Sequence, residues 1–566
     1  MNFHGDLTPD LINLIMLCDK NPELANDIVN NTTRYPILYK KALDGIPTSI
    51  IITKPLSCKE LNRMVKVTGS IIKTYPIFFK NVTSEQICLK CRATSYLSEH
   101  EASKLRGNLF CQSCGSSNLK TSQNFQHSFP IQTIKIQDMS NSDAMSETIE
   151  VNIEGEKVGV FQHGDKISVT GTVLRKWKSL RPNESMLSTL FIKAIQIIKD
   201  NDEENEYSEV KCLIDDYCSK NRFEKRSFII NSFCPELCGL YNVKLGFLLA
   251  LIGGAVGNKD PGASRLNSHV LIVGDPGTGK SHLLKATSKL VSPSIFTNGV
   301  GTSDAGLTSC AVRYEKEWTL EAGALVLADT GICCIDEFNR LKISEKSGLL
   351  EAMEQQTLSV AKAGMVTTLN SRCSVFAAAG IRYNYDSKRS ICDNLEMASP
   401  LVSRFDLIFG IFDKSNKDKD AEVCNYVLSR ESPVKLPEQI RWSQTTLRTF
   451  ISQCRKKKNN ITEPTCDILL KYYTKKRTLE GVNEFNTIRM LESLVRLTEA
   501  HSKLMGMDDV TEEDSFIALI LMETSINSAS SIAIDVEKVF VDQSYFEKIR
   551  GLICTKYGID FKEQTI

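Results

Sequence analysis

The sequence lacks a strong charge of either sign and any long apolar run. Its 566 residues carry 69 Lys and Arg against 68 Asp and Glu, which leaves a formal net charge of +1. No overall positive field exists, so binding to nucleic acid or to an anionic membrane would need local basic elements. The most apolar stretch, residues 245–256, is too short to span a bilayer and contains a glycine pair. We therefore expect a buried helix there and no membrane partner.

Tryptophan and histidine are scarce, at 3 and 7 residues, and the histidines show no spacing typical of a metal site. The N-terminus has acidic residues and a proline before a short apolar run, without the basic start or the cleavage site of a secretory signal. Cysteine, by contrast, is frequent at 19 residues. Because the cysteines are scattered through apolar segments, we expect a reducing compartment in which a few of them bind metal.

The chain is long enough for several domains, and 42% hydrophobic with 24% charged residues is an ordinary globular composition. Segments rich in Val, Ile and Thr fit a small barrel of the oligonucleotide-binding (OB) kind, or a sandwich. Further along, apolar strands alternate with helices, which predicts a mostly parallel α/β sheet. The predicted divisions are a helical segment at 1–60, the barrel at 61–198, an acidic linker at 199–208, the α/β core at 209–425, a helical region at 436–527 and a tail at 528–566.

Residues 274–281 match the phosphate-loop pattern G-x-x-x-x-G-K-[ST], directly after an apolar strand and before a helix. In such a loop, backbone N–H groups converge on phosphates at a helix N-terminus. Lys280 is expected to contact the β and γ phosphates, and Ser281 to ligate Mg²⁺. A chance glycine-rich turn is the alternative, which the flanking elements oppose. The predicted nucleotide-binding residues are Gly274, Asp275, Pro276, Gly277, Thr278, Gly279, Lys280 and Ser281.

An apolar strand at 332–335 ends in two acids, Asp336 and Glu337. Asp336 would orient Mg²⁺ through water, and Glu337 would polarise the attacking water. Alone, the pair would be an ordinary solvated strand end. Behind a complete phosphate loop it indicates a nucleotide hydrolase site, with Lys280 and Glu337 as catalytic residues.

Two arginines could complete that site. Arg404 precedes an apolar strand and could either pair with Asp406 or reach the γ-phosphate of a neighbouring subunit. In the helical segment 487–501, Ile488, Leu491 and Val495 would form an apolar stripe, with Arg489 on the opposite, charged face. That spacing is equally typical of a salt-bridged solvent face.

Four cysteines have the spacing of a zinc ribbon at about residues 85–118. Cys88 and Cys91 form one C-x₂-C pair, and Cys111 and Cys114 form another. Four thiolates fill a tetrahedral shell and leave no open position, which predicts a structural zinc. Two incidental pairs of buried cysteines and a redox pair are the alternatives.

Five segments, in chain order, resemble the ATPase core of the minichromosome maintenance (MCM) DNA helicases, a branch of the AAA+ ATPases: GDPGTGKS, GICCIDEFN, EAMEQQTLSVAKAG, SPLVSRFDL and TIRMLESLVRLTEAH. The parts of these segments that vary within the family are most similar to its nine-numbered branch, which acts in homologous recombination and DNA repair. The resemblance covers about residues 60–525. It implies an OB barrel with an inserted zinc ribbon, a AAA+ ATPase with a helical lid, and ATP, Mg and Zn as cofactors. A nuclear protein working as a homo-hexamer, or in a mixed ring with another MCM paralogue, on single- and double-stranded DNA is also implied.

The resemblance also assigns roles to single residues. Arg404 would be the arginine finger acting across a subunit interface, and Arg489 the second sensor. Lys362 would lie on a hairpin that holds the DNA backbone, whereas Arg313 and Lys316 are weaker candidates for DNA contacts.

One position departs from the family pattern. Gly380 replaces the first-sensor Asn, which would hydrogen-bond the γ-phosphate or the attacking water. Loss of one positioning group costs about 10² to 10³ in rate and leaves ATP binding largely intact. We therefore expect slow hydrolysis unless Asn384 compensates. The leading hypothesis is an ATP-dependent DNA helicase or translocase. Its rivals are an ATP-binding, hydrolysis-poor subunit of a mixed MCM ring and an AAA+ remodeller of proteins.

Overall fold

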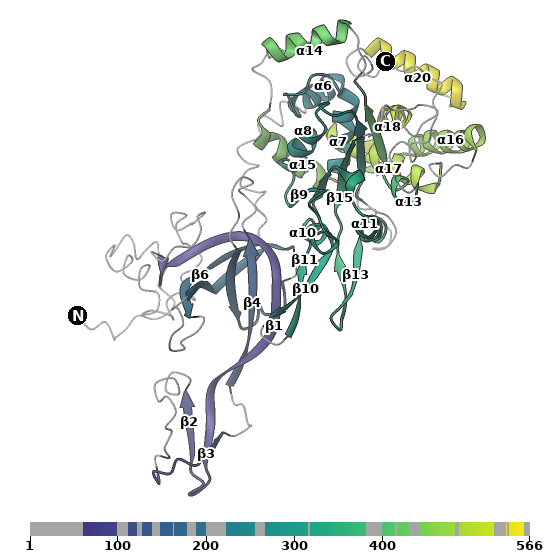
Figure 1. Ribbon diagram of the computed structural model, residues 1–566. Coiled ribbons are helices and arrows are strands. Elements are labelled where there is room, and N and C mark those ends of the chain that lie inside the picture. The colour runs from purple at the N-terminus through teal and green to yellow at the C-terminus, as the bar shows by residue number, and fades with distance from the viewer. Residues whose placement is uncertain are drawn as a thin grey trace. The chain divides into compact units, whose positions relative to one another are not determined.

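The computed structural model shows two compact units, one of Met1–Asp200 with Ala311–Ala322 and one of Asn201–Cys310 with Gly323–Ile566 (Figure 1). The predicted helical segment up to residue 59, residues 200–208 of the acidic linker, Lys316 and Asn384 lie outside the described residues. The structure describes residues 60–98, 111, 113–121, 127–137, 148–161, 164–177, 188–199, 222–254, 266–314, 317–380, 399–413, 417–429, 442–481, 486–525, 539 and 543–559.

The first unit contains a closed five-stranded barrel. Strand β1 pairs with both β4 and β6, so the sheet order β1-β4-β5-β7-β6 returns to its start. Neighbouring strands are antiparallel except β5 and β7, which are parallel. Alternate residues such as Val65, Ile134 and Val169 are fully buried inside it. This closure is that of the expected barrel and rules out a sandwich. The strands are β1 (Met64–Cys88), β4 (His127–Gln137), β5 (Thr148–Glu154), β6 (Lys166–Trp177) and β7 (Ser188–Lys199).

Strand β1 is long enough to extend beyond the barrel and carry further strands of the same sheet. Its far end pairs antiparallel with β2 (Thr94–Ser98) and β3 (Leu119–Thr121), which brings the two cysteine pairs together. Strands β10 (Ser309–Tyr314) and β11 (Glu317–Ala322) continue the sheet beside β1. There the buried Lys73 Nζ lies 2.9 Å from Glu321 Oε1.

The second unit is built on a parallel sheet of order β16-β8-β15-β12-β9. Four of its strands are apolar, as expected, whereas β9 was not predicted because only two residues of its sequence SIFTN are apolar and its side chains are half-exposed. Ligands of such sheets bind at the carboxyl ends of the strands. The strands are β8 (Val270–Gly274), β9 (Ser294–Asn298), β12 (Ile332–Asp336), β15 (Ser374–Gly380) and β16 (Leu407–Ile411).

Helices surround this sheet and continue into a helical region after it. Residues 245–252 of the apolar stretch form the second part of α7, which is buried along nearly its whole length as expected and ends before the glycine pair. Among the described residues, no helix combines the length and apolar character needed to cross a bilayer. The helices are α6 (Arg222–Ser232), α7 (Tyr241–Ile252), α8 (Lys280–Ser288), α9 (Asp304–Leu307), α10 (Ala324–Leu327), η5 (Phe338–Arg340), α11 (Ile343–Gln355), α13 (Ser399–Val402), α14 (Lys417–Ser429), α15 (Gln444–Lys456), α16 (Glu463–Glu480), α17 (Ile488–Leu504), α18 (Glu512–Thr524) and α20 (Gln543–Tyr557).

Two short two-stranded sheets complete the second unit. Strands β17 (Asn460–Ile461) and β18 (Asp509–Val510) join the helical region. Strands β13 (Thr357–Lys362) and β14 (Met365–Asn370) form a hairpin that projects away from the main sheet (Figure 1). Its two turn residues, Ala363 and Gly364, both have positive φ angles, as tight hairpin turns require.

The apolar face of helix α17 differs from the stripe that the sequence predicted. Ile488 is 65% exposed, and Leu491 and Val495 only flank the core, which is contacted instead by Met490 and Leu494. The opposite face is not a solvent face beyond its first turns, because the side chain of Arg496 is only 9% exposed. The helix packs against several elements at once, so most of its circumference beyond the first turn is buried.

Candidate nucleotide and metal sites

The predicted phosphate loop forms one wall of an open cavity of about 580 Å³. The loop connects β8 to α8 at the carboxyl edge of the sheet, and Gly277 and Gly279 have φ angles of +84° and +85°. A side chain at either residue would strain the backbone, and one at Gly279 would also collide with Leu237. The volume suits a ligand of nucleotide size. The cavity is lined by Pro276, Gly277, Gly279, Lys280, Ser281, His282, Asp336, Glu337, Asn339, Arg340 and Gly380.

Lys280 is folded back onto its own loop. Its Nζ donates hydrogen bonds to the backbone oxygen of Asp275 and, at 3.3 Å, to Thr278 Oγ1. Burial lowers the pKa of Lys280, while the carboxylates of Asp275 and Asp336 oppose that shift. An incoming phosphate can replace these neutral oxygens with charged ones, which gives a lysine ammonium stronger hydrogen bonds.

The two acids lie across the cavity from the loop, at the end of β12. Asp336 Oδ1 accepts a 2.9 Å hydrogen bond from the backbone N–H of Glu337, while the side chain of Glu337 is 47% exposed. Glu337 has a φ angle of +50°, an uncommon conformation for a residue with a side chain. Such strain costs about 1 to 3 kcal/mol and tends to occur at functional positions. The structure thus brings Lys280, Ser281, Asp336 and Glu337 into one cavity.

Arg404 and Arg489 lie elsewhere in the chain and share one carboxylate. Both guanidiniums donate to Glu354, at the end of α11, with 2.6 Å between Arg489 Nη2 and Glu354 Oε1. Arg404 also donates to the backbone oxygen of Pro400 at 2.5 Å. Neither arginine lines the cavity of the phosphate loop. No sequence pattern singles out Glu354, because one of its partners follows α13 and the other lies on α17, both far along the chain.

Asp406 does not pair with Arg404, which settles an alternative left open by the sequence. Its Oδ1 accepts a 2.7 Å hydrogen bond from Arg496 Nη2 and another from Ser493, while Oδ2 accepts from the backbone N–H of His269. Burial alone would raise the pKa of Asp406, but Arg496 and these other partners hold it below its ordinary value. Asp406 therefore anchors the segment that carries Arg404 to the helix that carries Arg489.

Gly380 ends β15 inside the cavity, level with Gly274 of β8. A Cβ atom placed there would meet nothing within 4 Å. The backbone oxygen of Gly380 accepts a 3.1 Å hydrogen bond from Asn339 Nδ2, which comes from η5. Sequence reasoning overlooked Asn339, although the residue lies only two positions after Glu337.

The four ribbon cysteines converge as the spacing predicted. Their Sγ atoms all lie within 4.8 Å of one another, with 3.5 Å between Cys88 and Cys114 and 3.4 Å between Cys91 and Cys111. Tetrahedral zinc thiolates have sulfur atoms about 3.8 Å apart, so the cluster fits such an ion. Backbone N–H groups of Cys114 and Ser113, together with the Cys91 thiol, lower the pKa of Cys111 to about 6.

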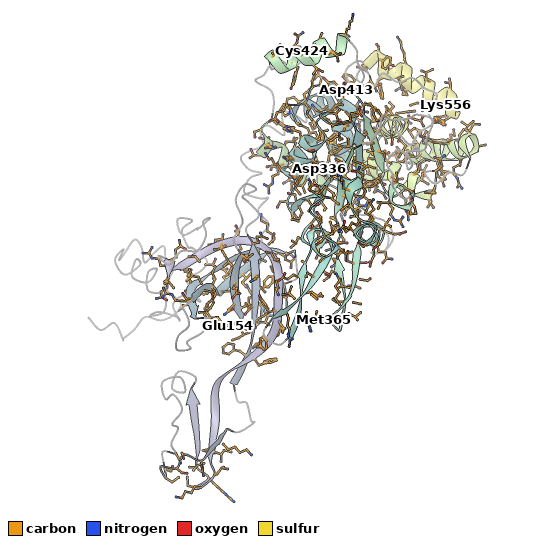
Figure 2. The ribbon with its side chains drawn as sticks, in the orientation of Figure 1. Glu154, Asp336, Met365, Asp413, Cys424 and Lys556 are labelled. Atoms are coloured by element: carbon orange, nitrogen blue, oxygen red, sulfur yellow. The ribbon has the colours of Figure 1, made fainter. Side chains whose placement is uncertain are left out.

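The three predicted DNA contacts are not equally placed. Lys362 ends β13 beside the turn of the hairpin, near the labelled Met365 in Figure 2, and its Nζ donates a 2.8 Å hydrogen bond to the backbone oxygen of Ser309. Asp304 Oδ2 lies 3.9 Å from the same ammonium. Arg313 is exposed on β10. Lys362 thus lies on a projecting hairpin, and its ammonium is tethered.

Comparison with known proteins identifies the family. Family models match residues 52–176 (MCM OB domain), 218–431 (MCM P-loop domain) and 445–526 (MCM AAA-lid domain). A probable DNA helicase MCM9 from Oryza sativa subsp. indica is 34% identical over 500 residues, which is 84% of this chain and 74% of that protein. This chain belongs to the MCM family. The OB barrel, the AAA+ P-loop domain and the lid described above are therefore the domains of an MCM protein.

Other MCM proteins are similar over comparable lengths. The probable DNA helicase MCM9 of Arabidopsis thaliana is 34% identical over 71% of this chain and 65% of its own. The minichromosome maintenance protein MCM of Saccharolobus solfataricus is 29% identical over 92% of this chain and 81% of its own. The likeness therefore extends through all three MCM domains.

Proposed function

We infer that this chain is a subunit of a ring-shaped, ATP-driven DNA helicase. Membership of the MCM family supports this, and two of the relatives above are named as probable DNA helicases. Replication or homologous recombination and repair in the nucleus is the proposed setting, the latter favoured by similarity to MCM9 proteins. The single observation that carries the proposal is the cavity in which a phosphate loop faces two carboxylates.

Within that cavity each residue has a distinct role. Lys280 binds the β and γ phosphates, Ser281 and Asp336 hold the Mg²⁺ that accompanies ATP, and Glu337 polarises the attacking water. Gly380 offers no side chain at the first-sensor position, so hydrolysis is slow for this class of site. Mg²⁺ supplies charge neutralisation at the phosphates when it is bound.

Neither Arg404 nor Arg489 lines the cavity of its own chain. Arg404 precedes β16, whereas the phosphate loop follows the end of the adjacent β8. We propose that Arg404 and Arg489 serve the cavity of a neighbouring subunit, as an arginine finger and a second sensor. A closed ring, of identical chains or mixed with another MCM paralogue, gives every cavity such a neighbour.

We further propose that Lys362 contacts DNA and that the ribbon holds zinc. Lys362 would exchange its bond to the backbone oxygen of Ser309 for one to a DNA phosphate as the hairpin moves. Zinc would be held by Cys88, Cys91, Cys111 and Cys114, a closed donor set that leaves no position for catalysis. Its contribution is structural, holding β1, β2 and β3 together at the tip of the first unit.

The shared site is tested by mixing two inactive variants, Lys280→Ala and Arg404→Ala. Each should lose ATP turnover, by about 10³-fold or more for the arginine variant. In rings assembled from equal amounts, roughly one quarter of the interfaces combine an intact loop with an intact arginine, so turnover should return. Native mass measurement confirms that mixed rings form. Mixed rings without recovered turnover would exclude an arginine supplied by the neighbour.

A second candidate function is an ATP-binding, hydrolysis-poor subunit of a mixed ring, which Gly380 favours. Steady-state ATPase with and without single-stranded DNA separates the possibilities. DNA-stimulated turnover supports the helicase, and ATP binding without turnover supports the hydrolysis-poor subunit. Turnover indifferent to DNA would indicate a protein remodeller, a function that the OB barrel already opposes.

A further inference from the structure

Gly380, which has no side chain in the nucleotide cavity, lies beside the carboxamide side chain of Asn339. Gly380 has open space where a Cβ would be, so nothing fills the place of the first-sensor side chain. Asn339 lines the same cavity and donates through Nδ2 to the backbone oxygen of that same glycine. The carboxamide side chain that β15 lacks at Gly380 thus has a counterpart nearby in the carboxamide of Asn339, which comes from η5.

The segment that carries Asn339 is firmly held. Phe338 is fully buried and packs edge-to-face on Phe405, with ring centroids 5.5 Å apart. Asn339 itself is half-buried. Its backbone therefore has little freedom to move, and its amide is fixed at the edge of the cavity by the 3.1 Å bond to Gly380.

A carboxamide has two N–H donors and an acceptor oxygen. The bond to Gly380 uses one of these donors, which leaves a second N–H and Oδ1 for further partners in the cavity. Those are the groups with which a first-sensor Asn positions the γ-phosphate or the attacking water. Glu337, the proposed polarising base, lines the same cavity as Asn339.

We propose that Asn339 is a positioning residue that supplies part of the amide function absent at Gly380. This rests on the proposed ATPase function and extends it to a residue outside the family's sensor position. A purely structural brace between η5 and β15 is the competing explanation. The two differ in one respect, because only a substitute amide becomes redundant when an asparagine is restored at position 380.

A double-mutant cycle tests this in the full chain: wild type, Asn339→Ala, Gly380→Asn and the double variant. The open space at Gly380 can take the new side chain. Asn339→Ala should lower kcat about 10²-fold with KM for ATP unchanged, as for the loss of one positioning donor. In the Gly380→Asn background the same change should cost only a few-fold, a coupling that marks residues acting on one target. An equal loss in both backgrounds would overturn the proposal.

Nucleotide binding gives a readout that does not depend on turnover. Asn339→Ala should weaken binding of MgADP with aluminium fluoride, a mimic of the transferring phosphate, and leave MgADP binding unchanged. Gly380→Asn should restore the weakened affinity. Equal weakening for both nucleotides, or no rescue, would indicate a brace. If the wild type binds nucleotide but shows no DNA-stimulated turnover, the helicase proposal fails alone, and the fluoride complex still decides the role of Asn339.

Asn460→Ala is the matched control. Asn460 is exposed on β17, outside the cavity, and should leave kcat and both affinities unchanged. Thermal melting of all variants checks folding. Asn339→Asp adds a second test. A carboxylate has the same shape but cannot donate to the backbone oxygen of Gly380, so kcat of this variant should fall as far as that of Asn339→Ala.

Discussion

At the scale of single residues, Glu354 has the most consequential position in the second unit. One carboxylate, 39% exposed, accepts hydrogen bonds from two guanidiniums that would otherwise repel each other. Long arginine side chains lose considerable rotamer freedom when they are fixed, so a shared anion that orients both of them lowers the entropy cost of using them. Glu354 therefore holds Arg404 and Arg489 together, as their proposed joint action on a neighbour's nucleotide requires.

Glu354→Gln should reduce DNA-stimulated ATP turnover about ten-fold, because slight misplacement of catalytic groups is costly. Binding of ATP to the isolated chain should not change, since Glu354 does not line the cavity of the phosphate loop. Steady-state kinetics and nucleotide titration measure the two effects. Glu463→Gln, an exposed acid on α16, is the control. Faster turnover in the Glu354 variant would show that this carboxylate competes with the phosphate.

At the scale of elements, short sequence patterns predicted the features that depend on residues close together in the sequence. The phosphate loop, the strand before Asp336 and the spacing of the ribbon cysteines are all legible within short windows, and the structure brings their members together. Strand β9 was not predicted because it is half-exposed and only two of its five residues are apolar. The faces of α17 were assigned wrongly because a helix packed on several sides buries charged residues such as Arg496 in internal ion pairs. The partners of Glu354 and Asn339 depend on tertiary packing, which short patterns do not report.

The proposed zinc ribbon is an element whose order should depend on its ion. Structural zinc sites supply folding energy directly, so Cys111→Ser should release the metal and unfold β2 and β3. Nucleotide binding by the second unit should be unaffected. Elemental analysis and a zinc-release assay measure the first effect, and nucleotide titration the second. Cys466→Ser, an exposed cysteine outside the cluster, should retain the metal. Absence of zinc from the purified wild type would contradict the ribbon assignment.

At the scale of the whole molecule, the second unit contains several buried ionisable groups whose charge states set its stability. His501 Nδ1 lies 2.6 Å from Asp514 Oδ1, with Arg226 and Glu513 nearby. Burial lowers the pKa of His501 from its ordinary value of 6.5, although Asp514 opposes the shift. The folded chain thus binds fewer protons at this residue than the unfolded chain. The stabilisation is complete above the unfolded pKa and is lost as pH falls below it.

The melting temperature should therefore decrease as pH falls from about 7.5 to 5.5. His501→Gln should flatten this dependence, even if the variant is less stable at every pH. A second decrease in melting temperature should follow below about pH 4, as Asp406 and Glu523 become protonated. The pKa values of both carboxyl groups are held low in the folded chain despite burial, mainly by Arg496 and Lys476 respectively. Calorimetric melting across this pH range measures both. A slope unchanged by His501→Gln would assign the upper transition to another group.

Strand β16 has one further mechanical consequence. It begins three residues after Arg404, and its last residue, Ile411, accepts a 3.2 Å hydrogen bond from the N–H of Asp275 in the phosphate loop. Five extended residues span about 16 Å and do not compress. A displacement of the segment that carries Arg404 would therefore be passed through β16 to the phosphate loop. In the proposed ring, this would couple the nucleotide state of a neighbouring subunit to that of the subunit itself.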